Sequence, residues 1–415
     1  MAPSAQTTTP IAQTPDSPVT TAAITNGVAP TGAKSRINSL DALRGLAVLM
    51  IFVVNIKMMA NGYNHYADRS LWEGAFDPAI GYVHSVFVHG KFVTIFTALF
   101  GAGLALLLAR DQPVAMPIVL RRLFWLAVFG AIHLIFIREG DIVLQYALVG
   151  VIAIAFVRQR ATVLFALGFA IQAALLFAAI VFPVEYTDIP ILWETGPDTH
   201  LEVERIMLGS FADHVSARID TVKFYLFDLF IVGWGWLDKL SVMIFGMALL
   251  KTGFLTGELA PKAYLKIGVA GALSASLLIA FRLSGGAELP YGENALNALW
   301  ILHRFGGAMA WSALVVGAVA MGWRAAALAA AGRAAFSIYI LQSVIGLALF
   351  SSLGLGLFGQ LTLGALSLVT LAVTAFFLIA APLWFARYRF GPLEWAWRSL
   401  TYGERQPWLR AAKAG

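Results

Sequence analysis

Long apolar segments recur along the chain and constrain its fold more than any other feature of the sequence. An α-helix needs about 20 predominantly apolar residues to cross the hydrocarbon layer of a membrane. A backbone inside lipid must satisfy its own hydrogen bonds, and a helix does so within one segment. Ten such segments are present, at roughly residues 43–60, 91–109, 119–137, 141–157, 162–182, 224–250, 262–281, 297–322, 335–353 and 362–386.

The composition agrees with this interpretation. Hydrophobic residues make up 59% of the chain and charged residues only 13%, whereas soluble domains carry about 25% charged residues. The apolar segments are too long, and alternate too little, for the strands of a β-barrel. We therefore predict an all-α polytopic integral membrane protein with about ten transmembrane helices.

The basic residues predict how these helices are oriented. Lys and Arg are enriched in the short cytoplasmic loops of membrane proteins. Every second connection carries such residues, for example Arg121 and Arg122, whereas the connection at residues 183–222 is acidic. We predict that both ends of the chain are cytoplasmic. The net charge of +6 follows from this bias and does not indicate a nucleic-acid partner.

The chain divides into three parts. Residues 1–36 are rich in Ser, Thr, Pro and Ala, which predicts a disordered cytoplasmic tail. Residues 37–404 are expected to form the transmembrane domain, with five spans on each side of an outer loop at 183–222. Residues 405–415 are expected to form a cytoplasmic tail. Apolar residues at helical spacing between 201 and 222 predict an interfacial helix in the outer loop.

The turn between the third and fourth apolar segments carries the most suggestive pair of side chains. His133 stands near the end of one segment and Asp141 opens the next. Ionisable groups at membrane depth are expensive and usually face the bundle interior or a wet cavity. A carboxylate beside an imidazole fixes its tautomer and raises its basicity, as a general base requires. Alternatively, His133 is a packing residue and Asp141 only caps the following helix.

Further polar side chains are expected at a similar depth, in the outer half of the membrane. They come from several different segments, which predicts one polar cavity open to the outside. The ends of spans are also where such residues cost least, so chance is the competing explanation. The candidates are Asn55, Lys91, Gln145, Asp228, His303 and Arg304, with Gln342 placed deeper.

A metal centre is not predicted. The sequence contains no cysteine, so no thiolate site or disulfide exists. His84 and His89 are five residues apart, which is poor spacing for joint metal binding on one helix. No group of His and Glu in the sequence resembles a zinc site.

Five motifs in order resemble the YeiB-like family of bacterial inner-membrane proteins, most of which lack an assigned activity. The resemblance covers residues 37–404 and implies a multi-pass protein of the bacterial inner membrane. The motifs are LDALRGLAVLMIFVVN (40–55), GKFVTIFTALFGAG (90–103), the His133 hairpin with GDIVLQYALVG, GRAAFSIYILQS (332–343) and GPLEWAWRSLTYG (391–403).

That family is similar to a wider superfamily of transmembrane acyltransferases. The superfamily includes heparan-α-glucosaminide N-acetyltransferases and the enzymes that O-acylate bacterial surface glycans. In the heparan acetyltransferase pattern, a first-span Asn precedes a catalytic His by about ten residues, which Asn55 and His65 fit. His65 is not part of the YeiB-like pattern, whereas His133 is. The two resemblances therefore nominate different bases, and we favour His133.

The resemblance implies transfer of an acyl group from cytoplasmic acyl-CoA to an extracytoplasmic acceptor such as an envelope glycan. His133 would act as the base, and Asn55 or Gln342 would stabilise the oxyanion. The alternatives are a transporter or exporter of a small polar or anionic solute, and a non-catalytic protein of envelope assembly. Candidate cations for the phosphates of acyl-CoA are Arg44, Arg121, Arg122 and Arg333.

Overall fold

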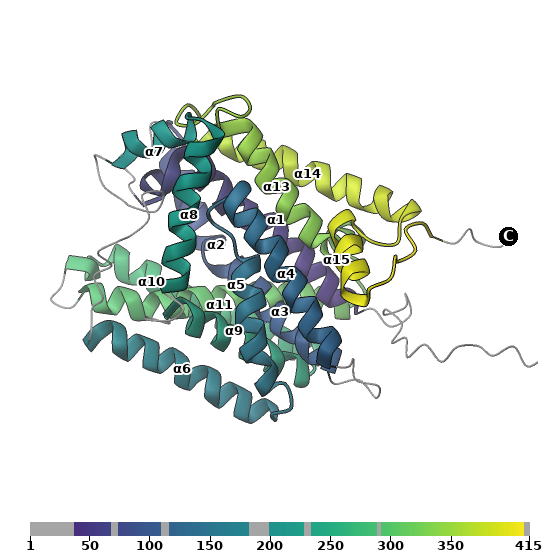
Figure 1. Ribbon diagram of the computed structural model, residues 1–415. Coiled ribbons are helices and arrows are strands. Elements are labelled where there is room, and N and C mark those ends of the chain that lie inside the picture. Colours follow the sequence, from purple (N-terminus) through teal and green to yellow (C-terminus); the bar gives the residue numbers. More distant parts are fainter. Residues whose placement is uncertain are drawn as a thin grey trace, which may run out of the picture. The chain divides into compact units, whose positions relative to one another are not determined.

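The computed structural model describes residues 37–67, 74–108, 116–181, 199–227, 234–288 and 292–410 (Figure 1). These ranges contain helices and no β-strand, which confirms the all-α prediction. Three predictions lie outside the described residues: the tail at 1–36, the last residues of the C-terminal tail, and the candidate Asp228.

Fifteen α-helices are present in the described ranges, several of them joined by short turns. In chain order they are α1 (Asn38–Ala67), α2 (Asp77–Phe87), α3 (Lys91–Leu108), α4 (Met116–Phe136), α5 (Val143–Ala153), α6 (Ala161–Val181), α7 (Thr199–Met207), α8 (Phe211–Phe227), α9 (Trp234–Lys251), α10 (Pro261–Leu283), α11 (Gly292–Ala320), α12 (Ala326–Arg333), α13 (Ala335–Phe350), α14 (Leu363–Arg387) and α15 (Pro392–Tyr402).

The apolar helices confirm that the chain is a polytopic membrane protein. Among the described residues, seven helices are long and apolar enough to cross a membrane, or eight if the bent pair α12 and α13 forms one span. Each of the ten predicted segments contains a helix. Two of these helices fall short: α5 is brief, and α9 carries Asp238, Lys239 and Lys251 within 18 residues. The count of ten and the orientation stay predictions.

Helices α4 and α5 form a tight hairpin that positions the candidate pair. A Cβ added at Gly130 of α4 would collide with the backbone of Leu144 in α5. A glycine here lets the two helix backbones approach closely, as small residues do in membrane bundles. His133 therefore lies on the stretch of α4 that faces the start of α5.

The segment predicted to form the outer loop contains two helices, α7 and α8, where the sequence predicted one. Helix α7 packs on α1 and α8, and α8 packs on α4. His214, Arg218 and Thr221 of α8 are all buried. They are spaced four and three residues apart, so they share one helix face. Helix α8 thus turns a polar stripe toward the end of α4 that carries His133.

The C-terminal helix α15 packs against α4 and α13. Its Glu394 accepts hydrogen bonds from the backbone N–H groups of Phe336 and Ser337 at 2.8 and 3.2 Å. These are free donors of the first turn of α13, so Glu394 acts as a cap supplied by another helix. The cap fixes where α13 begins and therefore where its side chains meet the hairpin.

Candidate active site

His133 and Asp141 form a buried pair across the α4–α5 turn. The Nδ1 atom of His133 lies 2.7 Å from Oδ2 of Asp141, and both side chains are about 1% exposed. An ionised carboxylate only accepts hydrogen bonds, so Nδ1 carries the proton and donates it. This tautomer leaves the lone pair of the imidazole on Nε2.

Asp141 serves both roles that the sequence left open. One oxygen accepts from His133, and the other accepts from the backbone N–H of Leu144 at 2.6 Å. The second contact satisfies a free donor in the first turn of α5. The carboxylate is therefore held on two sides, and it holds the imidazole in one orientation.

The free face of His133 meets helix α13. Its Nε2 atom is buried and makes no hydrogen bond to the part of the chain that the structure describes. The ring of Tyr339 lies 5.2 Å away, centroid to centroid, and its hydroxyl donates to the carbonyl of Gly140. Gln342, one turn further along α13, is also buried, and both of its amide atoms lack a partner among the described residues.

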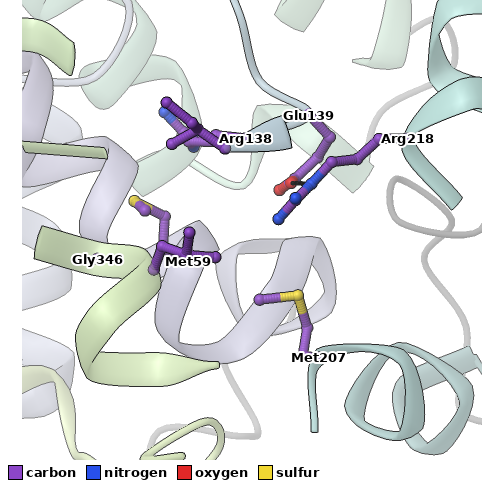
Figure 2. Close-up of a pocket in the computed structure, with 8 residues that line it drawn as sticks. Met59, Arg138, Glu139, Met207, Arg218 and Gly346 are labelled. Atoms are coloured by element: carbon purple, nitrogen blue, oxygen red, sulfur yellow. Dashed lines mark ion pairs between the residues drawn. The ribbon is translucent and has the colours of Figure 1, made fainter. Parts of the chain in front are cut away.

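A small cavity lies between α1, α7, α8, α13 and the α4–α5 turn; the turn contributes residues 137–139, and neither His133 nor Asp141 lines the cavity. Figure 2 shows Arg138 on one side of it and Glu139 with Arg218 on the other, with Met59 and Met207 below. Its empty volume is about 230 Å³, including the part that opens to solvent. Arg138 follows directly in the turn, since its backbone N–H donates to the carbonyl of His133 at 2.8 Å.

The two arginines of this cavity have incomplete hydrogen bonding within the described residues. Nε of Arg218 lies 3.7 Å from Oε2 of Glu139, a loose contact compared with the roughly 2.7–2.9 Å of a charge-assisted hydrogen bond. Burial lowers the pKa of Arg218, and Glu139 opposes that change. Burial and the neighbouring Arg218 also lower the pKa of His214, so this imidazole is neutral near pH 7.

A second group of predicted residues lies around α3, α9 and α11. Lys91 donates to the carbonyls of Ser85 and His89, both at 3.3 Å, and contacts Nε2 of His303 at 2.7 Å. Nδ1 of His303 donates to the carbonyl of Ala275 at 2.6 Å. The Nε2 lone pair of His303 therefore accepts from Lys91, and all three ammonium hydrogens have acceptors.

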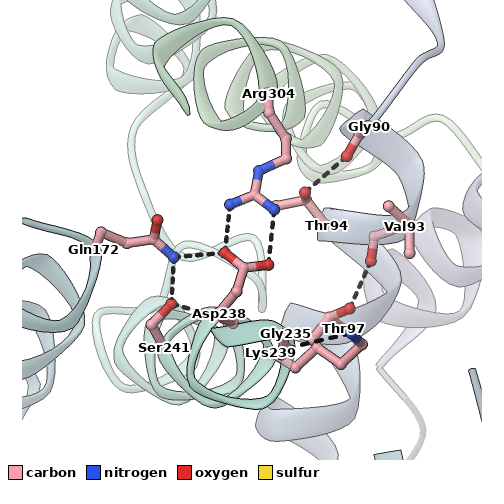
Figure 3. A network of polar contacts seen from close by, with 10 residues as sticks. All are labelled: Gly90, Val93, Thr94, Thr97, Gln172, Gly235, Asp238, Lys239, Ser241 and Arg304. Carbon is pink, nitrogen blue, oxygen red and sulfur yellow. Dashed lines mark hydrogen bonds and ion pairs between the residues drawn. The ribbon is translucent and has the colours of Figure 1, made fainter. Parts of the chain in front are cut away.

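Arg304 belongs to a network that ties three helices together (Figure 3). Its Nη1 and Nη2 atoms bind both oxygens of Asp238, at 2.8 and 2.6 Å. Gln172 of α6 donates to the same carboxylate at 2.8 Å and to Ser241 at 2.6 Å. Among the predicted cavity residues, direct contacts thus join Lys91 to His303, and Arg304 is tied to Asp238.

Comparisons with known proteins support the predicted YeiB-like resemblance. The uncharacterized protein YeiB of Escherichia coli (strain K12) is 29% identical over 392 residues, which cover 88% of this chain and 95% of YeiB. The uncharacterized protein YxaH of Bacillus subtilis (strain 168) is 28% identical over 414 residues, which cover 92% of this chain and 98% of YxaH. Residues 249–404 match the family described as "Protein of unknown function (DUF418)".

The chain is YeiB-like. The predicted resemblance is thereby confirmed, and it extends over nearly the whole length of both relatives. The DUF418 match includes Tyr339, Gln342 and Glu394 on the α13 side of the site. His133 and Asp141 lie before it in the chain.

The remaining candidates of this YeiB-like chain make no hydrogen bond to His133 in the part of the chain that the structure describes. Asn55 is half-buried on α1, and Gln145 is buried on α5. His65 follows the kink at Gly62, where φ is 69°, and its side chain lies outside what the structure describes. The position of the His65 imidazole therefore cannot be compared with that of His133.

Two of the arginines predicted to bind acyl-CoA, Arg121 and Arg122, contact α15. The guanidinium of Arg122 lies over the ring of Trp397, 3.7 Å from its centroid, and Arg121 donates to the carbonyl of Thr401 at 3.4 Å. Arg44 and Arg398 are close enough to Arg122 to act on it electrostatically.

The other two predicted cations have contacts of their own. Arg44 also pairs with Asp41 at 3.0 Å. Arg333 packs over the ring of Phe385, 4.0 Å from its centroid. Arg398, which the sequence did not single out as a phosphate ligand, thus joins Arg44 and Arg122 in one basic cluster.

The sequence did not single out Arg138, Arg218, His214 or Asn61. Asn61 is buried on α1, and its Oδ1 has no partner among the described residues. One signal was present: polar residues at positions 214, 218 and 221 repeat at helical spacing on the face opposite the apolar residues. A polar stripe on a helix usually faces water. It predicts a buried polar face only when a partner such as Glu139, about 80 residues away in the sequence, is known to lie opposite it.

Proposed function

We propose that this protein is a transmembrane acyltransferase that moves an acyl group from cytoplasmic acyl-CoA to an extracytoplasmic acceptor, such as an envelope glycan. The observation that supports it most is the buried His133–Asp141 pair, whose Nε2 atom has no partner in the described part of the chain. This is the arrangement of a general base: a carboxylate fixes one nitrogen and the other is free to take a proton.

The chemistry is a single acyl transfer. Nε2 of His133 takes the proton of an acceptor hydroxyl or amine while that oxygen or nitrogen attacks the thioester carbonyl carbon. The carbon–sulfur bond then breaks, the acyl group stays on the acceptor, and the CoA thiolate takes the proton from the imidazolium. Asp141 stabilises the imidazolium between the two steps. The amide nitrogen of Gln342 is a candidate donor to the oxyanion that forms during the attack.

The donor end of the reaction is assigned to the basic cluster of Arg44, Arg122 and Arg398. Phosphate groups are recognised well by guanidinium groups. Eleven residues separate Arg122 and His133 on α4, which is about 16 Å along the helix axis. That is roughly half the hydrocarbon thickness of a membrane, so a thioester carried on the long arm of CoA has about half the membrane to cross.

The proposed acyl donor also determines in which membrane the protein must lie. Acyl-CoA is a cytoplasmic metabolite, so a bacterial enzyme that uses it must face the cytoplasm on one side. We therefore assign the protein to the inner membrane, with the lipid bilayer and the extracytoplasmic acceptor as its partners. Apart from acyl-CoA as co-substrate, no cofactor enters the proposal.

The test is thermal stabilisation of the purified full-length protein by acetyl-CoA, longer acyl-CoAs and free CoA. A ligand that binds only the folded state raises the melting temperature by mass action. We expect a clear shift that Arg122→Gln and Arg398→Gln abolish and that Arg205→Gln, a change at an exposed arginine of α7, leaves intact. No shift at millimolar acyl-CoA would contradict the proposal and favour the transporter alternative.

A further inference from the structure

The cavity at the α4–α5 turn contains two buried guanidinium groups and one carboxylate. Arg138 is 2% exposed and Arg218 1%. In each of them Nε and Nη1 make no hydrogen bond to any residue that the structure describes. Glu139 contacts Arg218 only loosely, at 3.7 Å. Asp141, the next carboxylate in the turn, binds His133 and the N–H of Leu144.

Burying these guanidinium groups without acceptors costs free energy of folding unless a ligand binds them. A guanidinium stays charged in proteins, and a buried charge needs a partner with good geometry and hydrogen bonds. Four buried N–H-bearing nitrogens, two from each arginine, lack an acceptor in the described ranges. The group they suit is an anion with several oxygens, because the planar fork of Arg matches carboxylate and phosphate.

The size of the cavity limits what enters it. The empty volume of about 230 Å³ includes open solvent, and the enclosed part has room for about one water molecule. The side chains around it must therefore move apart to admit a phosphate or carboxylate, and the rest of such a molecule would lie outside the cavity. The backbone hydrogen bond from Arg138 to the carbonyl of His133 places the cavity wall within one turn of the proposed base.

We propose that Arg138 and Arg218 bind an anionic group of the acceptor, a phosphate or a carboxylate, and hold the acceptor beside Nε2 of His133. The acceptor class is then an acidic or phosphorylated glycan or headgroup rather than a neutral sugar. The identification of the bound molecule as the acceptor rests on the proposed function, whereas the anion site rests on the cavity and its arginines.

The experiment uses the full-length protein in nanodiscs of zwitterionic lipid, without acyl-CoA. The probes are inorganic phosphate, glucose 1-phosphate and glucuronate, with glucose as the neutral control, and the readout is the melting temperature against probe concentration. We expect saturable stabilisation by the anions and none by glucose. Arg138→Gln and Arg218→Gln should each weaken binding about ten- to hundredfold, since hydrogen bonds to charged groups contribute about 1.5–3 kcal/mol. Arg205→Gln should bind as the unmodified protein does.

Two further variants separate binding from folding. Glu139→Gln should tighten anion binding several-fold, because it removes the negative charge that shares the cavity; a purely structural Glu139 would not produce a gain. If Arg138→Gln does not fold, Arg138→Lys keeps the charge but loses the fork, and it should still bind the anions more weakly.

Discs that contain phosphatidylglycerol distinguish the source of the anion. Stabilisation that requires this lipid and is lost in Arg138→Gln supports the site and identifies a lipid headgroup as its ligand. Equal anion binding in the unmodified protein and both arginine variants would overturn the proposal, as would no stabilisation by any anion or anionic lipid.

The acyl-CoA measurement decides the proposed function independently. Retention of the acetyl-CoA shift in Arg138→Gln would show that the two sites are distinct. Anion binding without any acyl-CoA shift would leave the anion site standing and remove the acyltransferase.

Discussion

Two polar groups inside the helix bundle differ in how well their side chains satisfy one another. Around α9 and α11, Lys91 has three acceptors, and Asp238 binds both terminal nitrogens of Arg304 together with Gln172. Within the described residues only Nε of Arg304 is left without a partner in this network.

Around the α4–α5 turn, by contrast, several buried polar atoms have no partner in the described ranges. Besides Nε2 of His133 they include the whole amide of Gln342 and two nitrogens of Arg138. Buried polar groups in folded proteins are normally hydrogen-bonded, and each exception calls for a physical reason. The satisfied network holds helices together, whereas the unsatisfied one has the character of a site that completes its hydrogen bonds with a ligand.

The largest effect on turnover is expected when Asp141, the carboxylate of the His133–Asp141 pair, is replaced. Asp141→Asn can no longer enforce the Nδ1–H tautomer, and the same change in a catalytic triad lowers turnover about 10⁴-fold. We expect a comparable loss of acyl transfer with the protein still folded, measured as release of free CoA from acetyl-CoA in the presence of envelope acceptors. Turnover close to that of the unmodified protein would remove Asp141 from the mechanism.

One substitution at Gln342 tests its roles in function and in stability separately. Gln342→Leu removes a buried amide without partners among the described residues, so the melting temperature should rise or stay the same. If the amide stabilises the oxyanion, turnover should fall about 10²-fold. The two measurements are a thermal melt and the CoA-release assay. A large loss of stability with normal turnover would mean that Gln342 is structural.

In the network around Arg304, a substitution should instead lower stability and leave function unchanged. Asp238→Asn leaves Arg304 with a neutral partner, which should cost about 2 kcal/mol of stability, since hydrogen bonds to charged groups contribute about 1.5–3 kcal/mol. Per folded molecule, acyl-CoA binding should be unchanged. Reversible unfolding in detergent and the acyl-CoA melting shift check both statements. Loss of acyl-CoA binding by a fully stable variant would break the comparison.

The smallest effect on stability is expected when Glu394, which caps α13, is replaced. Burial raises the pKa of Glu394, while its hydrogen bonds with Ser337 and the backbone oppose the change. A raised pKa in the folded state means that the stabilisation is present at low pH and is lost as pH rises through that pKa. Glu394→Gln keeps the accepting oxygen, so it should change stability by less than about 1 kcal/mol. It should also flatten the decline of melting temperature with rising pH; an unchanged pH profile would contradict this.

Much of the fold followed from local patterns. The apolar segments predicted where helices occur, because burial in lipid needs runs of a fixed length. The contact between His133 and Asp141 could be expected, since they flank one short turn. The loose pair of Glu139 and Arg218 could not, because α8 reaches the turn only through tertiary packing. The same applies to Asp238 and Arg304, whose helices are separated by α10 in the chain.

The basic cluster of Arg44, Arg122 and Arg398 likewise could not be predicted from sequence patterns alone. Arg121 and Arg122 were visible as a basic pair at the start of a span. Arg398 joins them because α15 packs back on α4, and no periodicity in either segment encodes that contact. Sequence patterns thus found the residues of single turns, and the structure was needed for clusters assembled from distant helices.

The central claim is that Nε2 of His133 is the base of an acyl transfer, and CoA release tests it most directly. The assay compares the unmodified protein with His133→Gln and His65→Gln, in membranes supplied with acetyl-CoA and envelope acceptors. We predict that His133→Gln loses turnover by about 10²–10⁴-fold while it still binds acetyl-CoA, and that His65→Gln is unaffected. Full turnover in His133→Gln, with loss in His65→Gln, would contradict the account.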